Sequence, residues 1–323
     1  MRALPRWKPA QLSLFCSALG MMLCVGSIGA GDRTTASANP AQDFAGRWNL
    51  EVDETGGFTT AWLEVVPLDT HRASGRLVWL YGGAEPIAEI QIVGRELRFL
   101  HHFMRENLVF TATLAAGRLT GFTSGPRTSV HWTATRSPDL PRSASPQWDA
   151  FRPLFNGQDL SGWSARNPRG LYCWQVDEGV LVNDSPCWDL ITYERFADFR
   201  LHLEFKVIEG TGSGVYLRGR YEVQIADDAE RPASPRTTGA IFGYIAPSTS
   251  VAKPRGEWQS KDVELVGRVV TVSINDVVVV SDFEIPGITG AALDIQEDRP
   301  GPIMLQGDHG RVAFRNVLVA PSL

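Results

Sequence analysis

After residue 30 the sequence is divided into short runs in which apolar and polar residues alternate, and no run has a helical period. Side chains point alternately to the two faces of a strand, so each run predicts a strand with one buried face. Glycine, proline, aspartate or asparagine separates the runs, which is typical of turns between strands. Hydrophobic residues make up 43% of the chain, enough for a packed core. We therefore expect an all-β protein.

Residues 44–136 contain the first group of runs, which is compact enough for one small domain. The runs are RWNLEV, TAWLEVV, GRLVWLY, IAEIQIV, ELRFLHHF, LVFTATL, RLTGFT and VHWTATR. Short antiparallel strands in this number predict a small β-barrel-like domain or a tight sandwich. The opening FAGRWNLEV resembles the Gly-x-Trp start of lipocalin-like barrels, in which a tryptophan plugs one end of the barrel. This packing motif is compatible with many functions, so it assigns none to the domain.

Residues 137–150, SPDLPRSASPQWDA, are rich in proline and serine and predict an extended linker. Strand-like runs resume at residue 151 and continue to residue 323. The runs are YCWQV, GVLVN, RLHLEFKVI, GVYLR, YEVQI, GAIFGYI, KDVELVG, VVTVSIN, VVVVSD, PIMLQ and VAFRNVLVA. So many strands without helices predict a second domain built as a two-sheet sandwich.

The first thirty residues differ from the rest of the chain. Arg2, Arg6 and Lys8 precede an apolar run that continues to Ala30, which is the layout of a secretory signal peptide. We expect cleavage near residue 30 or 38 and an exported protein, periplasmic or extracellular, without stable membrane insertion afterwards. The alternative is an uncleaved anchor, because the apolar run approaches the length that spans a membrane.

Cleavage would remove three positive charges and no acidic residue, so the exported chain is more acidic than the whole sequence, whose formal charge is −5. An acidic chain is a poor partner for nucleic acids, and none is expected. Of the four cysteines, Cys173 and Cys187 remain after cleavage. An even pair in an oxidising compartment predicts a disulfide, with two buried thiols as the alternative. Nothing in the sequence indicates an oligomeric state.

Two neighbouring runs, GVYLR and YEVQI, carry long polar residues on one face. Parity places Tyr216 and Arg218 on one face of the first run, and Glu222 and Gln224 on one face of the second. Pairing the two strands in register gathers these four side chains on one sheet surface. An aromatic ring, a cation, a carboxylate and an amide together suit a sugar, which needs stacking and several hydrogen bonds. The alternative is an exposed face with a surface ion pair.

Residues 151–323 resemble the 3-keto-disaccharide hydrolase family along nearly their whole length. The resemblance is carried by FRPLFNGQDLSGW, WQVDEGVL, FADFRLHLEFK, GSGVYLRG, YEVQIADD, TGAIFGYIAP, PRGEWQ, GPIMLQGDHG and VAFRNVLV, in the family's order. It implies a concanavalin-A-like jelly-roll sandwich. It also implies cleavage of glucosides oxidised to a ketone at C3, either by direct hydrolysis or by a lyase step followed by hydration. Because the first domain lies outside the resemblance, we expect a chain beginning near Gln147 to fold and act alone.

The resemblance also implies which residues do the chemistry. Glu222 or Asp227 is the expected base that removes the proton at C2, and His309 is the expected acid or second base. Arg218 is expected to hold the enolate oxygen. The expected substrate-binding residues are Tyr216, Gln224, Trp258 and Gln306. The segment RPASPRTT, residues 231–238, is expected to form a loop at the rim of the site.

The chain departs from the family pattern at Gly212 and Gln259, where the family usually has asparagine, and this puts the substrate preference in question. No spacing of histidine, cysteine and carboxylates is typical of a zinc site, so no metal and no cofactor is expected. The expected partner is an oligosaccharide or glycoside substrate. The alternative function is a non-catalytic carbohydrate-binding module, since the same fold serves lectins. A lectin needs no titrating pair such as Glu222 and His309, so this pair distinguishes the two functions.

Overall fold

The computed structural model describes residues 39–54, 57–140, 146–167, 173–183, 187–210 and 212–323. Within these residues the chain has one short helix, α1 (Pro40–Phe44), and twenty-one strands. The prediction of an all-β protein is therefore confirmed. The predicted signal peptide lies outside the described residues.

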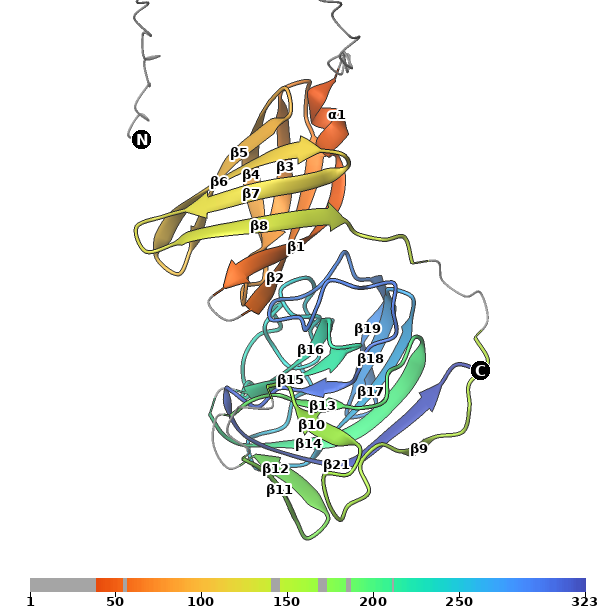
Figure 1. Cartoon of the computed structure of the whole chain (residues 1–323). Coiled ribbons are helices and arrows are strands. Elements are labelled where there is room, and N and C mark those ends of the chain that lie inside the picture. The colour runs from red at the N-terminus through yellow and green to blue at the C-terminus, as the bar shows by residue number, and fades with distance from the viewer. Residues whose placement is uncertain (1–38, 55–56, 141–145, 168–172, 184–186, 211) are drawn as a thin grey trace, which may run out of the picture. The chain divides into compact units, whose positions relative to one another are not determined.

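The first domain is a closed antiparallel barrel (Figure 1). Its strands are β1 (Gly46–Glu54), β2 (Gly57–Pro67), β3 (Arg72–Val78), β4 (Ala84–Val93), β5 (Glu96–Phe103), β6 (Glu106–Ala115), β7 (Arg118–Ser124) and β8 (Ser129–Arg136). Each strand pairs with the next, and β1 also pairs with β8, which closes the barrel. Of the two architectures compatible with the sequence runs, the structure has the barrel.

The Gly-x-Trp start packs one end of the barrel against α1. Trp48 is fully buried, and its indole donates a hydrogen bond to the backbone oxygen of Phe44 at 2.9 Å. The guanidinium of Arg136 lies 3.9 Å from the centre of the Trp48 ring. Gly46 has a φ of +112°, and a Cβ at this position would lie 2.9 Å from an Arg136 nitrogen. A glycine is therefore required at the entry to β1.

The second domain consists of two sheets, as predicted (Figure 1). The first sheet has the order β10 (Trp163–Ala165), β13 (Leu190–Thr192), β20 (Met304–Leu305), β15 (Gly212–Leu217) and β16 (Tyr221–Ala226). The second has the order β11 (Trp174–Asp177), β12 (Val180–Asn183), β21 (Gly310–Pro321), β14 (Phe199–Gly210), β17 (Gln259–Val266), β18 (Val269–Ile274) and β19 (Val277–Glu284). The short strand β9 (Arg152–Pro153) pairs with β21. The predicted two-sheet sandwich is confirmed.

Strands β15 and β16 present different residues to their two sides, as parity predicts. Their core-facing side chains are Val215, Leu217, Tyr221, Val223 and Ile225. The register pairs Tyr216 with Glu222 and Gly214 with Gln224. The side chains of Tyr216, Glu222 and Gln224 therefore share the face that is turned away from the core of the sandwich.

Cys173 and Cys187 form a disulfide, so the pairing predicted from the cysteine count is confirmed. The two cysteines are 14 residues apart in the sequence. Closing a loop of this length lowers the entropy of the unfolded chain and stabilises the fold by about 3 kcal/mol. The bridge also ties Cys187, which adjoins Trp188 and Asp189 in the chain, to the residue directly before β11.

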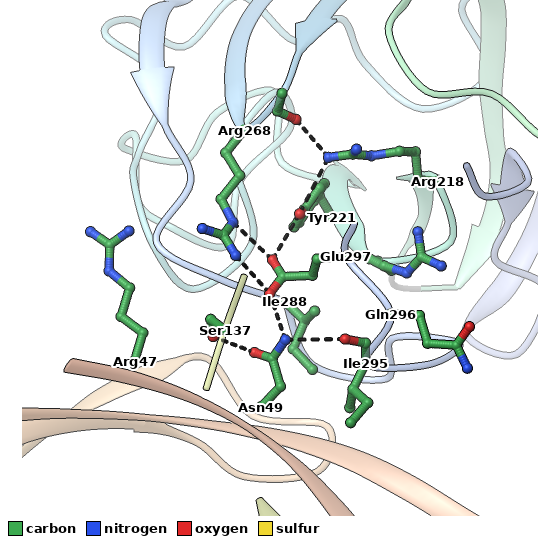
Figure 2. A network of polar contacts seen from close by, with 12 residues as sticks. Arg47, Asn49, Ser137, Arg218, Tyr221, Arg268, Ile288, Ile295, Gln296 and Glu297 are labelled. Carbon is green, nitrogen blue, oxygen red and sulfur yellow. Dashed lines mark hydrogen bonds and ion pairs between the residues drawn. The ribbon is translucent and has the colours of Figure 1, made fainter. Parts of the chain in front are cut away.

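A buried polar network joins the barrel to the sandwich (Figure 2). Glu297 is fully buried and accepts two hydrogen bonds from Arg268, at 3.0 and 2.8 Å, and one from Tyr221 at 2.8 Å. Asn49 of β1 donates to the same carboxylate at 2.6 Å and to the backbone oxygen of Ile295 at 3.1 Å. A buried carboxylate needs such complete pairing to offset its loss of hydration.

Apolar packing continues across the same boundary. Trp62 and Val78 of the barrel belong to the hydrophobic core of the sandwich. The ring of Trp62 meets Tyr244 edge to face at 5.6 Å, and a Cβ on Gly287 would lie 2.0 Å from the Trp62 indole nitrogen. Barrel and sandwich lie within one compact unit. This shared core argues against the expectation that residues from 147 onward fold alone.

Candidate active site

A cavity of about 970 Å³ lies against the face of β15 and β16 that is turned away from the sandwich core. Its walls include Tyr216, Glu222 and Gln224 from these strands, together with Gln306 and His309 from the region between β20 and β21. The structure thus brings five of the eight predicted site residues to one cavity. The barrel contributes further wall residues. The volume falls in the range of about 300–1,000 Å³ that is usual for small-molecule sites.

Glu222 is buried on β16, and its carboxylate lies over the backbone of Gly214 on β15. A Cβ on Gly214 would lie 2.4 Å from Glu222 Oε1, so only a glycine leaves room for the carboxylate there. Burial raises the pKa of Glu222 from 4.5 to about 8, against the opposing effects of Tyr216, His309 and Lys261. A carboxyl group with this pKa can take up and return a proton near neutral pH.

The hydroxyl of Tyr216 connects Glu222 to the protein backbone. The Tyr216 oxygen lies 2.9 Å from Glu222 Oε2 and 3.0 Å from the backbone oxygen of Gly290. A hydroxyl carries one proton, so it can donate to only one of these acceptors at a time. Both contacts are hydrogen bonds when Glu222 is protonated and donates to Tyr216, which in turn donates to Gly290. When Glu222 is ionised, Tyr216 can instead donate its proton to the carboxylate.

His309 lies in the turn before β21 and forms a hydrogen bond with Asp308. This bond is the main cause of the raised pKa of His309, and the negative charges of Asp308, Glu222 and Asp189 act in the same direction. In return, the charge of His309 lowers the pKa of Glu222. The two predicted proton-transfer residues therefore influence each other across the cavity, and their titrations are coupled.

Two amide side chains line the cavity beside this pair. The backbone of Gln306 is held by β15, because its N–H donates to Gly214 at 3.0 Å and its oxygen accepts from Ser213 at 2.8 Å. The side-chain oxygen of Gln224 is buried and has no hydrogen-bond partner within the described residues. A buried acceptor without a partner is costly, and a bound ligand would supply one.

The structure does not place Arg218 with these residues. Strand β15 ends at Leu217, and Arg218 has a φ of 54°, so the backbone turns before the side chain can continue the alternation. The guanidinium instead donates to the backbone oxygen of Gly267 at 2.6 Å and lies over the ring of Tyr221. Parity failed here because it holds only while the strand continues.

Asp227 and Trp258 also lie outside the cavity lining. Asp227 follows β16 and faces Arg255 across 3.6 Å. The ring of Trp258 lies under two cations, Arg315 at 4.1 Å and Lys206 at 4.8 Å. The expected roles of Asp227 as a base and of Trp258 as a sugar platform thus have no support from their positions.

Several residues of the cavity were missed in the sequence. Asp189 accepts from the backbone N–H of Gly307 at 3.1 Å and from Arg166 at 3.2 Å. Arg166 also donates to the backbone oxygens of Ala291 and Ala292. No short-range pattern connects these distant positions, and both lie outside the family motifs found in the sequence.

Other missed residues carried a signal. Arg231 and Arg236 line the cavity, as the expected rim loop suggests, although neither was singled out. Lys261 is fully buried beneath β16 and donates to the backbone oxygens of Val223 and Gln224 at 2.9 and 3.1 Å. Burial lowers its pKa to about 7. Lys261 lies two and four residues from Val263 and Leu265, so its side chain points to the same face as these apolar residues, and this pattern indicates an inward-facing position.

Within the described ranges, no group of three or more histidine, cysteine or acidic side chains is arranged to hold a metal ion. In the same part of the chain, no helix has both the length and the apolar character needed to cross a membrane. The cavity is thus lined by one imidazole, that of His309, and by carboxyl, amide and guanidinium groups; the carboxyl groups are those of Glu54, Asp189, Glu222 and Asp308. Such a set can transfer protons and bind hydroxyl groups.

Comparison with known proteins agrees with the sequence motifs. A family model described as the 3-keto-α-glucoside-1,2-lyase-like domain matches residues 150–320, which is more than half of the chain. The chain belongs to this family. The predicted family resemblance is therefore confirmed, and the barrel lies outside the matched residues.

A 3-keto-disaccharide hydrolase from Bacteroides thetaiotaomicron is 22% identical over 164 residues, and the match covers 40% of this chain and 57% of that protein. The chain thus spans little more than half the length of this relative. Two crystal structures of a "putative glycosyl hydrolase" from Parabacteroides distasonis are 27% and 24% identical. They cover 56% and 53% of this chain and 93% of their own, each with a TM-score of 0.45.

Proposed function

We propose that this protein cleaves 3-keto-glycosides by elimination followed by hydration. The ketone at C3 acidifies the hydrogen on C2, so a base can form an enolate. The enolate expels the group on C1 and leaves a double bond between C1 and C2, across which water then adds. The net reaction consumes one water and releases the 3-keto sugar and the alcohol that was bound to C1.

The observation that carries this proposal is the buried carboxyl group of Glu222 beside the imidazole of His309 in one cavity. Ionised Glu222 takes the proton from C2, and protonated His309 gives a proton to the leaving oxygen. During hydration, His309 takes a proton from water, and Glu222, whose proton exchanges with solvent after the leaving group departs, protonates C2. Both residues end in their starting states, so the cycle balances.

The pKa shifts of the two residues suit this exchange. Burial raises the pKa of Glu222 to about 8, and the Asp308 hydrogen bond raises the pKa of His309. The two groups therefore compete for a proton near neutral pH. The productive form has an ionised Glu222 and a protonated His309. Tyr216 stabilises this form when its hydroxyl donates to the carboxylate.

The remaining cavity groups suit a sugar that becomes an anion during the reaction. The unpartnered oxygen of Gln224 would accept a hydrogen bond from a sugar hydroxyl. Arg231 and Arg236 place positive charge at the cavity and would lower the energy of the enolate. Arg218, which was expected to do this, points elsewhere.

Incubation with 3-keto-disaccharides and with their unoxidised parents tests the proposal. We expect release of free sugar from the oxidised compounds alone, because the parents have no acidified C2 hydrogen. In D₂O, elimination places deuterium at C2 of the product faster than in a protein-free control, whereas direct hydrolysis does not. Binding without cleavage of any 3-keto compound would refute the proposal and favour the carbohydrate-binding module.

We also propose that the protein is exported. The basic start, the apolar run to Ala30 and the Cys173–Cys187 disulfide support this. When the full chain is expressed in a Gram-negative bacterium, we expect it in the periplasm or the medium, shortened by about 30–38 residues. The denatured, unreduced product should contain no free thiol. A full-length cytoplasmic product with two free thiols at these positions would refute export.

A further inference from the structure

The part of the barrel that reaches the cavity carries three large exposed apolar side chains, beside Glu54 and Thr59. Its wall residues include Phe58 near the start of β2, Tyr81 between β3 and β4, and Met104 between β5 and β6. In an up-and-down barrel these connections lie at the same end, so the three side chains form one apolar rim. Their exposed fractions are 73%, 54% and 68%. Large apolar side chains left uncovered beside a cavity mark a binding surface.

The two sides of the cavity differ in chemistry. Glu222, Gln224 and His309 on the sandwich side are polar and suit the oxidised sugar. The apolar rim lies on the barrel side, and Trp188 of the sandwich, also partly exposed, joins it in lining the cavity. A glycoside has the same division, with the reacting sugar on one side of the C1–oxygen bond and the leaving group on the other.

The barrel is held against the site by direct contacts. The N–H of Ala291 donates to the backbone oxygen of Leu80 in the barrel at 2.9 Å. The neighbouring Gly290 accepts the Tyr216 hydrogen bond, and Thr289 accepts from the N–H of Glu222 at 3.0 Å. The segment that positions Tyr216 and Glu222 therefore also touches the barrel, one residue before Tyr81.

Close packing and the polar network leave the barrel little freedom to move away. A Cβ on Gly290 would lie 2.6 Å from the backbone oxygen of Gly82, and a Cβ on Gly243 would lie 2.3 Å from Gly83. The Thr60 hydroxyl donates to the backbone oxygen of Ala292 at 3.1 Å. Together with the Glu297 network in Figure 2, these contacts hold the apolar rim at the cavity.

We propose that the barrel forms the leaving-group subsite of the enzyme, in which Phe58, Tyr81 and Met104 bind a ring-shaped leaving group by stacking and apolar contact. The proposal rests on the proposed function and assigns a role to the domain that lies outside the family match. An aromatic ring and a pyranose both present an apolar face to such a surface. The experiment below separates these two sources of the ring.

The test compares three 3-keto-glucosides whose leaving groups are methanol, phenol and glucose. We expect the wild type to prefer one or both ring-bearing compounds over the methyl compound in kcat/KM. In Phe58→Ala this preference should fall by about 10- to 100-fold, as for the loss of one large apolar contact. Tyr81→Ala and Met104→Ala should reduce it in the same direction. The ring-bearing compound whose kcat/KM falls more in these variants shows whether the subsite binds an aryl ring or a sugar ring.

Leu100→Ala is the matched control, because Leu100 is an equally large apolar residue of the barrel, 67% exposed, and does not line the cavity. It should retain the wild-type preference. An unchanged preference in all three rim variants, or an equal loss on the methyl compound, would overturn the leaving-group subsite. If the wild type cleaves none of the compounds, the proposed function fails, and calorimetric binding of the same compounds still measures the preference.

Discussion

Replacing Glu222 with glutamine is expected to lower kcat on a 3-keto-disaccharide by about 10²–10⁴-fold, the usual contribution of a general acid–base group. Glutamine keeps the shape of the side chain beside Gly214 and its hydrogen bond with Tyr216, but it cannot take a proton from C2. KM should change much less than kcat, because the sugar contacts remain. Steady-state kinetics on the purified variant measures both constants.

Stability distinguishes a catalytic loss from a structural one. Because burial raises the pKa of Glu222, the folded protein binds its proton more tightly than the unfolded chain between about pH 4.5 and about pH 8. The Glu222 contribution to stability therefore falls as the pH rises through this window. Glutamine does not titrate, so Glu222→Gln does not lose stability as the pH rises in this way. At pH 8 the variant should therefore be at least as stable as the wild type. Near wild-type turnover in this variant would show that Glu222 is not the base.

The pH profile of kcat/KM reports the coupled pair in the free enzyme. Activity should rise as the first of the two protons leaves and fall as the second leaves, because the productive form holds one proton on His309. In His309→Ala the alkaline fall should disappear and kcat should drop. The acid limb should move to higher pH, because the charge of His309 no longer lowers the pKa of Glu222.

Much of the fold follows from local sequence patterns. Alternation predicted the strands, and the Gly46-x-Trp48 start fits the barrel because Gly46 needs a positive φ and Trp48 needs a buried end. The joining of barrel and sandwich could not be predicted in this way. It depends on pairs such as Trp62 with Gly287 and Asn49 with Glu297, which are more than 200 residues apart and fit no local period.

The candidate site shows the same limit. Tyr216, Glu222 and Gln224 were placed correctly on one face because parity within two paired strands determines it. The placement of Arg218 on that face was wrong, because the strand ends before Arg218 and the backbone turns there. The sequence contains no sign that Phe58 and Tyr81 approach a cavity, because hairpin connections with aromatic residues are common on any barrel. Only the packing of the two domains brings them there.

The same packing leads to the largest expected loss of stability, in Glu297→Leu. The substitution leaves the guanidinium of Arg268 buried without its carboxylate and removes an acceptor from Asn49 and Tyr221 (Figure 2). Breaking a buried pair from one side costs about 3–5 kcal/mol. Urea unfolding of the whole protein measures the change. The control is Glu264→Leu, which breaks the partly exposed Arg200–Glu264 pair and should cost about 1 kcal/mol or less.

A double variant shows whether the loss of stability comes from the unpaired Arg268 or from the absence of the carboxylate itself. Arg268→Met combined with Glu297→Leu removes both charges, so most of the stability should return, since apolar residues can replace a buried ion pair. Equal unfolding free energies for Glu297→Leu and Glu264→Leu would show that the network does not join the domains. If the network does join the two domains, Glu297→Leu should also loosen the barrel from the cavity. At a pH and temperature where the variant is still folded, its preference for ring-bearing leaving groups should then fall towards that of Phe58→Ala.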